Sequence, residues 1–201
     1  MTYKAIIFDL GQVVFRAGFN KKYDLLCEKY NIKPNDSLFQ EFREIWNSAK
    51  IGKVNSEEFF SAIANKLNTD PKEVKELLIS GISLNENVKD LILKLRNRYK
   101  IGILTNNIKE FYEADLKLWN FEEIGEVVAS FKTGVAKPDP EAIQLILDKL
   151  NVTKEETIFI DDHNETTSKY NKIGIRSITY DGYDELLINL RNLGVEVWLK
   201  K

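Results

Sequence analysis

The segment Ala5-Ile6-Ile7-Phe8, followed directly by Asp9, is an apolar run without polar alternation. Runs of this kind are typical of strands that are buried on both faces of a parallel sheet. Four further runs share this character: Ile101–Leu104, Val127–Ala129, Thr157–Ile160 and Ile175–Thr179. Helical patterns, with apolar residues three and four positions apart, lie between most of them, as in Val88–Leu95 and Ala142–Leu150. This alternation predicts an α/β fold with a parallel sheet flanked by helices.

One interval breaks the alternation. From Arg16 to Ser83 the sequence carries helical patterns and no convincing strand. Asn55–Glu58 reads as a helix start with a capping-box-like Glu, and Thr69-Asp70-Pro71 starts another helix. We therefore expect a core built from residues 1–15 and 84–201 and an inserted helical module over residues 16–83. The aromatic residues expected to pack inside this module are Phe15, Phe19, Tyr23, Phe39, Phe42 and Trp46.

The composition excludes several classes of function. Lys and Arg together number 29 against 31 Asp and Glu, so no basic excess favours nucleic acid or a membrane surface. No stretch approaches the roughly 18 apolar residues of a membrane span. The single Cys27 allows no internal disulfide, and the single His163 leaves little room for a multi-histidine metal site. No signal peptide is visible at Met1–Lys4, which favours a cytoplasmic location.

Polar residues follow four of the apolar runs. These are Asp9, the segment Thr105-Asn106-Asn107, Lys137 in the loop after Val127–Ala129, and the pair Asp161-Asp162. Ligands of open parallel sheets bind beyond the carboxyl ends of the strands. If the strands are neighbours, these side chains converge on one crevice.

Such a set of groups has a clear chemical use. Carboxylates repel one another unless a cation lies among them, and oxygen ligands suit Mg²⁺. Lys and Thr supply hydrogen-bond donors for anionic oxygens, and a carboxylate can attack phosphorus to form an aspartyl-phosphate. Taken singly, each residue is also compatible with an ordinary turn, helix cap or solvated loop. Their joint placement at successive strand ends favours the catalytic interpretation.

Four segments resemble, in order and spacing, the motifs of the haloacid dehalogenase (HAD) superfamily. The segments are Phe8–Val14 (FDLGQVV), Ile103–Asn107 (ILTNN), Gly134–Pro140 (GVAKPDP) and Phe159–Asp162 (FIDD). The helical module, including Gly52–Phe59, is similar to the C1 cap that follows the first strand in this superfamily. The resemblance covers essentially the whole chain and implies a Rossmann-like core with an inserted helical cap.

The resemblance also implies roles for individual residues. Asp9 is the expected nucleophile and a Mg²⁺ ligand, Thr105 binds the transferring phosphoryl group, and Lys137 steadies Asp9 and its phosphorylated form. The other expected metal ligands are Asp161, Asp162 and the carbonyl of Gly11. Asn106 is a further expected substrate contact besides Thr105 and Lys137. Arg16 and Asn20 are expected to contact substrate because they enter the helical module close to the first motif.

Gly11 is the main departure, because most phosphatases of the superfamily have a second Asp there as general acid and base. A branch with Asp-Leu-Gly-Asn-Val at this point, which includes a glucose-1-phosphate phosphatase, resembles this sequence well. His163, beside the expected metal ligands, is a further possible proton donor.

The resemblance therefore implies a Mg²⁺-dependent hydrolase that removes phosphate from a small phosphorylated metabolite, with sugar phosphates favoured. The expected protein is a monomer or homodimer without nucleic-acid or membrane partners. Two alternatives stay open. One is a 2-haloacid dehalogenase, which works without metal and usually lacks the paired acids at Asp161-Asp162. The other is a protein that binds a phosphorylated ligand with low turnover, which Gly11 favours.

Overall fold

A single parallel sheet forms the centre of the computed structural model, which describes residues 2–33 and 36–197. Its strand order is β3-β2-β1-β4-β5. The strands are β1 (Ala5–Phe8), β2 (Lys100–Thr105), β3 (Glu126–Ala129), β4 (Thr157–Asp161) and β5 (Arg176–Thr179). All five predicted strands are confirmed, and every pairing is parallel. The central position of β1 places the residue that follows it between the ends of β2 and β4.

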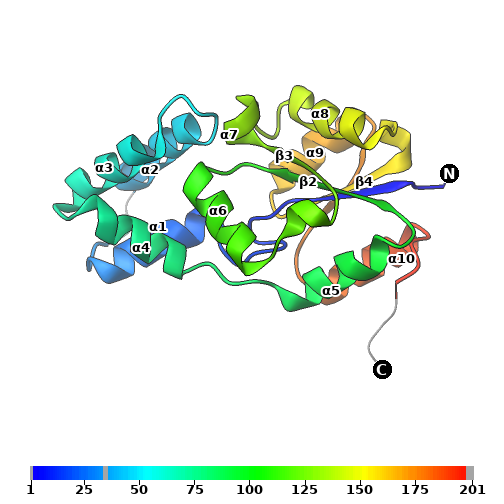
Figure 1. Ribbon diagram of the computed structural model, residues 1–201, viewed down its shortest axis with the longest axis horizontal. Coiled ribbons are helices and arrows are strands. Elements are labelled where there is room, and N and C mark those ends of the chain that lie inside the picture. The colour runs from blue at the N-terminus through cyan, green and yellow to red at the C-terminus, as the bar shows by residue number, and fades with distance from the viewer. Residues whose placement is uncertain (1, 34–35, 198–201) are drawn as a thin grey trace.

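Helices cover both faces of the sheet, which explains the unbroken apolar runs (Figure 1). Ala5 and Ile7 of β1 belong to the apolar cluster under α8 (Pro140–Leu150) and α9 (Asn164–Lys172). Ile6 and Phe8 belong to the opposite cluster, which includes residues of α5 (Glu86–Leu95), α6 (Lys109–Leu118) and α10 (Tyr183–Asn192). The remaining short elements of the core are η1 (Phe121–Glu123), α7 (Ser130–Thr133) and η2 (Lys154–Glu156).

Gly102 in β2 allows the close approach of α8 to the sheet. A Cβ at this position would lie 2.9 Å from Leu150 Cδ1 and 3.1 Å from Ile146 Cγ1. Real Cβ atoms rarely come this close to their neighbours, so a larger residue would push α8 away. The glycine therefore helps to fix the helix that follows the loop of Lys137.

The described part of the inserted segment contains the helices α1 (Phe19–Lys29), α2 (Asp36–Ala49), α3 (Ser56–Leu67) and α4 (Pro71–Ser80). Asn55 and Glu58 form the predicted capping box at the start of α3, with hydrogen bonds of 2.9 and 3.1 Å. Asp70 accepts a hydrogen bond of 2.7 Å from the Lys72 backbone at the start of α4. Both predicted helix starts are therefore confirmed. The described residues between 16 and 83 contain no strand.

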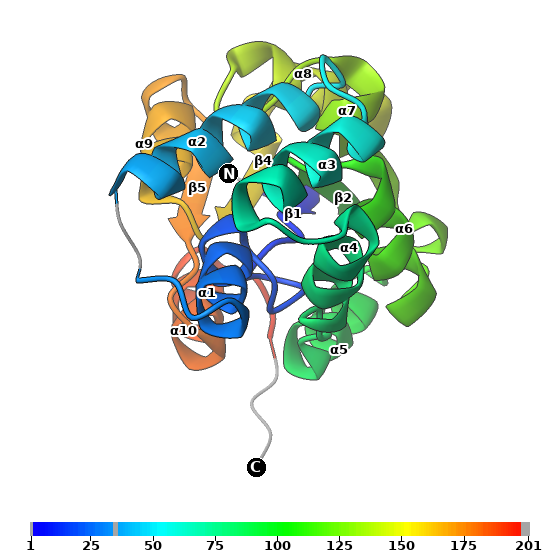
Figure 2. The same ribbon diagram turned by 90° about the vertical axis from the view of Figure 1, so that its left-hand side faces the viewer.

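The inserted helices lie over the carboxyl ends of the strands, as Figure 2 shows by looking onto α2 and α3 with the sheet behind them. The chain enters and leaves the segment at neighbouring points, because the Arg16 N–H donates to the Ser83 carbonyl at 2.7 Å. Aromatic contacts join the segment to the core: Phe59 and Phe60 pack edge-on against Phe111 of α6. One apolar cluster thus runs from the insert into the core. None of the described helices is long and apolar enough to cross a membrane.

Candidate active site

Three polar residues are buried together at the carboxyl edge of the sheet. Asp9 follows β1, Thr105 ends β2 and Asp161 ends β4, and each is at most 6% exposed. The register places Phe8 opposite Ile103 on one side and Ile160 on the other, so the three strands end at the same level. The predicted convergence of these strand ends is present in the structure.

Lys137 lies between the two buried carboxylates. Its Nζ is 2.6 Å from Asp9 Oδ1 and 2.5 Å from Asp161 Oδ2. Its backbone is held by the side chain of Asn106, which accepts from the Lys137 N–H and donates to the Lys137 carbonyl, both at 2.9 Å. Sequence analysis predicted a substrate contact for Asn106, whereas the structure shows its amide engaged in positioning Lys137.

The electrostatics of this group reflect two carboxylates in contact with one ammonium, with Asp162 near Asp9. Burial alone would lower the pKa of Lys137, but the charges of Asp161 and Asp9 outweigh it and raise that pKa. Burial is the main cause that raises the pKa of Asp9 to about 7; Lys137 acts against this increase, and the charges of Asp161 and Asp162 contribute to it. The single ammonium therefore does not offset the negative charge gathered at the strand ends. A bound cation would complete that balance.

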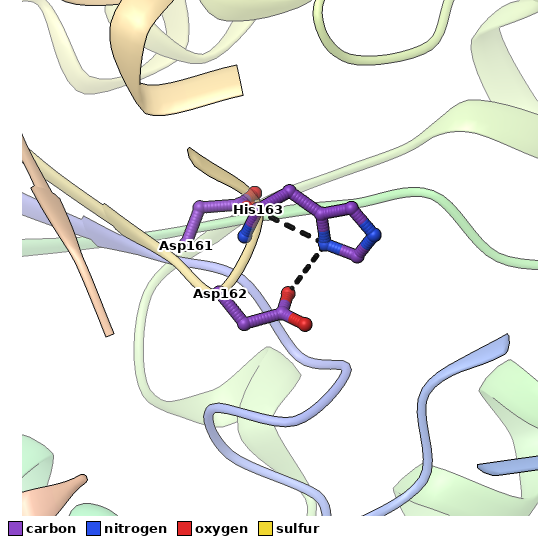
Figure 3. Close-up of side chains that lie close together, drawn as sticks. All are labelled: Asp161, Asp162 and His163. Atoms are coloured by element: carbon purple, nitrogen blue, oxygen red, sulfur yellow. Dashed lines mark hydrogen bonds and ion pairs between the residues drawn. The ribbon is translucent and has the colours of Figure 1, made fainter. Parts of the chain in front are cut away.

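A compact set of metal-ligating atoms lies at the end of β4. One ligand atom each from Asp161, Asp162 and His163 lie within 4.8 Å of one another (Figure 3). His163 Nδ1 is 2.8 Å from Asp162 Oδ1, and the His163 backbone N–H donates to Asp161 Oδ1 at 2.8 Å. Asp9 lies outside this trio and is linked to it by Lys137. Buried and half-exposed carboxylate oxygens fit Mg²⁺, which binds through few carboxylates and keeps water ligands.

The position of Gly11 adds space beside Asp9. A Cβ built on Gly11 would lie 3.7 Å from Asp9 Oδ2 and 4.0 Å from the carbonyl oxygen of Ala17, which is ordinary contact. Gly11 does not have a positive φ, so a side chain could occupy this space without backbone strain. Neither the space nor the backbone at this position requires glycine. What Gly11 changes is the chemistry, because the site lacks the carboxyl group that most phosphatases of the superfamily carry there.

These residues share a cavity of about 290 Å³ that lies between the core and the inserted helices. From the core it is lined by the predicted residues Asp9, Gly11, Thr105, Asn106, Lys137, Asp161 and Asp162. From the insert it is lined by Ala17, Gly18, Phe19, Asn20, Lys22, Arg43, Trp46, Asn47 and Lys50. Asn20, for which a substrate contact is predicted, therefore lies at the cavity. Arg16 is exposed and does not line it, so the predicted substrate contact of Arg16 finds no place in this cavity.

Sequence analysis missed a second pair of buried ionisable groups in this cavity. Lys22 of α1 and Asp115 of α6 are 7% and 5% exposed. The Lys22 Nζ donates to the Ala17 carbonyl at 3.0 Å, and Asp115 accepts from Asn107 Nδ2 at 2.9 Å. The signal was available, because Lys22 lies four positions before Leu26 on the apolar stripe of α1.

Three aromatic residues also differ from expectation. Tyr23 and Phe42 are buried in the insert as predicted, but Phe19, Phe39 and Trp46 are only half-buried, and Phe19 and Trp46 line the cavity. A periodic aromatic stripe does not reveal which of its members lies at the edge of the packed interior.

The fold agrees with comparisons to known proteins. The family model for haloacid dehalogenase-like hydrolases matches residues 6–180. The chain therefore belongs to the haloacid dehalogenase-like hydrolase family, as the four motifs predicted.

Individual relatives are distant. Drimenol cyclase drtB from Aspergillus calidoustus is 22% identical over 199 residues, which span 94% of this chain and 36% of that protein. Sesquiterpene phosphatase astK from Aspergillus oryzae is 21% identical over 179 residues, spanning 87% and 88% of the two chains. The chain spans about a third of the length of the first curated relatives that it matches.

Among solved structures, a HAD family enzyme from Bacteroides thetaiotaomicron superposes with a TM-score of 0.76 at 21% identity. The match covers 92% of this chain and 98% of that one, and that crystal structure is a complex with magnesium and inorganic phosphate. At this identity the likeness concerns the fold.

Proposed function

We propose that this protein is a Mg²⁺-dependent phosphatase that acts on a small phosphorylated metabolite through an aspartyl-phosphate on Asp9. The observation that carries the proposal is the placement of Lys137 between Asp9 and Asp161 beneath the cavity. Sesquiterpene phosphatase astK, which matches most of the chain, supports the reaction class.

In the proposed reaction, a carboxylate oxygen of Asp9 attacks phosphorus while the bond from phosphorus to the ester oxygen breaks. Lys137 donates hydrogen bonds to the carboxylates and offsets charge on the transferring group, and Thr105 binds one of its oxygens. Water then attacks the phosphorus of the aspartyl-phosphate, which releases inorganic phosphate and regenerates Asp9. Asp9, Asp161, Asp162 and the Gly11 carbonyl would hold Mg²⁺, which supplies charge neutralisation for the phosphoryl oxygens.

Sugar phosphates are the favoured substrate class. Gly11 provides no acid to protonate the leaving oxygen, so substrates with a stable leaving group are expected to react best. The leaving hydroxyl of a sugar 1-phosphate is more acidic than that of a primary alcohol, which makes these esters the first to test.

The test is a hydrolysis panel of sugar phosphates, aryl phosphates and 2-haloacids, run with Mg²⁺ and with a chelator. We expect phosphate release that requires Mg²⁺ and that is abolished in folded Asp9→Asn. Full activity of Asp9→Asn would exclude the covalent mechanism. Halide release without metal would favour the dehalogenase alternative, and phosphate binding without turnover would favour the low-turnover alternative.

A further inference from the structure

A continuous aromatic surface forms one wall of the cavity. The ring centroids of Phe19 and Trp46 are 5.7 Å apart, and Trp46 stacks on Phe111 at 6.1 Å. All three rings line the cavity that contains Asp9. When the phosphoryl group of an ester lies at Asp9, the rest of the substrate molecule can therefore pack against this apolar wall.

Two cations flank Trp46 on the same side of α2. Arg43 precedes Trp46 by three residues, and Lys50 follows it by four, so the three side chains share one helix face. The Lys50 N–H bonds to the Trp46 carbonyl at 2.9 Å, which continues the helical turn to Lys50. The Arg43 guanidinium carbon lies 5.8 Å from the centre of the Phe19 ring. All of these residues line the cavity.

Lys50 and Arg43 place two positive charges at the cavity, and neither forms an ion pair with a described carboxylate. Burial lowers the pKa of Lys50, and the charges of Arg43 and Lys137 lower it further. Across the described ranges, no carboxylate lies within ion-pair distance of Lys50 or Arg43. Glu165, which also lines the cavity and is close enough to Arg43 to feel its charge, forms its ion pair with Lys169 at 2.8 Å instead.

Lys22 differs from this pair. Its ammonium already bonds to the Ala17 carbonyl, and Asp115 offsets its charge. Lys50 and Arg43, in contrast, have no described carboxylate within ion-pair distance, and their like charges repel each other. An anionic ligand is the group that would relieve this repulsion.

We propose that Arg43 and Lys50 form a second anion-binding subsite, so that the substrate is a phosphate ester with a second anionic group. That group is a carboxylate or a second phosphoryl group, and the organic body between the two anions rests on Trp46. The proposal rests on the proposed function for the placement of the first phosphoryl group at Asp9. It narrows the substrate class to doubly anionic esters, such as phosphorylated sugar acids or sugar bisphosphates.

The kinetic test compares esters that differ only in the second group. These are 3-carboxyphenyl phosphate, its neutral partner 3-carbamoylphenyl phosphate, and the bisphosphate of 1,3-dihydroxybenzene, each assayed with Mg²⁺. We expect wild-type kcat/KM to be higher for an anionic ester than for the neutral one. Whether the carboxylate or the bisphosphate is preferred identifies the second anion.

Variants of Lys50 and Arg43 test whether these two residues cause the preference for the anionic esters. Lys50→Gln and Arg43→Gln should each reduce the preference roughly tenfold, the effect of losing a hydrogen bond to a charged group. The matched control is Lys53→Gln, because Lys53 is exposed, follows Lys50 by three residues and does not line the cavity. It should keep the wild-type preference. Equal losses on charged and neutral esters in Lys50→Gln and Arg43→Gln would overturn the subsite.

A binding measurement separates this proposal from the proposed function. Titration calorimetry with 3-phosphonobenzoate and with phenylphosphonate, which cannot be hydrolysed, needs no turnover. Tighter binding of 3-phosphonobenzoate by wild type, with the difference reduced in Lys50→Gln, supports the subsite even if no ester is hydrolysed. Equal binding of the two ligands by wild type overturns the subsite even if phenyl phosphate is hydrolysed. Melting curves confirm that each variant is folded.

Discussion

Asn106 and Lys137 are joined by two hydrogen bonds of 2.9 Å, one to the N–H and one to the carbonyl of Lys137. The first residue follows β2 and the second lies in the loop after α7, so this contact ties two separate parts of the candidate site together. Because Lys137 Nζ contacts both Asp9 and Asp161, the position of its backbone controls the geometry of the three charged groups.

We expect Asn106→Ala to lower kcat about tenfold with a smaller change in KM. The ammonium of Lys137 would keep its charge but would no longer be held in place against Asp9 and Asp161. Steady-state kinetics on an aryl phosphate measure both parameters. The exposed Asn97→Ala serves as control. A rise in KM alone would instead support the direct substrate contact that sequence analysis predicted for Asn106.

Removal of the Lys137 ammonium leaves two buried carboxylates without their shared partner. Lys137→Met is therefore expected to lose activity by about 2–4 kcal/mol of transition-state stabilisation. In the presence of a chelator it should also lose about 3–5 kcal/mol of unfolding free energy. Urea unfolding measures the second effect, with exposed Lys172→Met as control.

Added Mg²⁺ should stabilise Lys137→Met more than wild type, because a cation replaces the missing positive charge among the carboxylates. The same urea curves recorded with Mg²⁺ check this expectation. Equal stabilisation of the two proteins would show that the ion binds away from Asp9 and Asp161.

The buried pair of Lys22 and Asp115 should behave as a coupled unit. Either single variant, Lys22→Met or Asp115→Asn, removes the charge that offsets the other buried group and should cost about 1–3 kcal/mol of unfolding free energy. The double variant should cost much less than the sum of the two. Chemical unfolding of the four proteins completes the cycle, and additive losses would show that the two groups do not interact.

The same pair predicts a pH dependence of stability. Burial raises the pKa of Asp115 to about 7, while Lys22 and the Asn107 side chain act to lower it. The folded protein thus binds more protons than the unfolded chain between the ordinary Asp pKa and about 7. The contribution of Asp115 to stability is therefore present at low pH and is lost as the pH rises through about 7.

Unfolding free energies measured at pH 5 and pH 7.5 test this prediction. The decrease between the two values should be smaller in Asp115→Asn than in wild type and in the exposed control Asp148→Asn. If Asp115→Asn keeps the full decrease, another group is responsible for it.

The sheet and its strand-end residues could be predicted because apolar runs and turn residues act locally. The run Ala5–Phe8 has no polar alternation, and the parallel sheet buries it on both faces. Helix starts at Asn55 and Asp70 depend on neighbouring backbone groups only, and both were predicted. The convergence of Asp9 and Asp161 follows once β1 and β4 are neighbours.

The cavity wall opposite these residues could not be predicted, because it depends on how the inserted helices pack on the core. Trp46 lies in the same periodic stripe as Phe42, yet Phe42 is buried and Trp46 lines the cavity. Lys50 has no local pattern that distinguishes it from the exposed Lys53. The stacking of Trp46 of α2 on Phe111 of α6 turns the helix face that carries Lys50 toward the cavity.

Restoring an acid at Gly11 is the last test of the proposed chemistry. The space beside Gly11 accepts a Cβ at 3.7 Å from Asp9 Oδ2, and the backbone there needs no positive φ. Gly11→Asp should therefore fold and place a carboxyl group near the leaving oxygen. If proton transfer limits the rate on poor leaving groups, the added acid should recover part of a deficit of about 10²–10⁴-fold.

A series of aryl and alkyl phosphates measures this effect as the dependence of log kcat on the pKa of the leaving alcohol. We expect a shallower dependence in Gly11→Asp than in wild type, with the largest gains on alkyl phosphates. Gly18→Asp is unsuitable as control, because a Cβ there would lie 2.7 Å from Gln12 Cγ, so exposed Asn164→Asp is used instead. An unchanged slope in folded Gly11→Asp would mean that protonation does not limit the rate, or that a residue already present supplies the proton. His163 is the first residue to test in that event, because its ring lines the cavity beside Asp162.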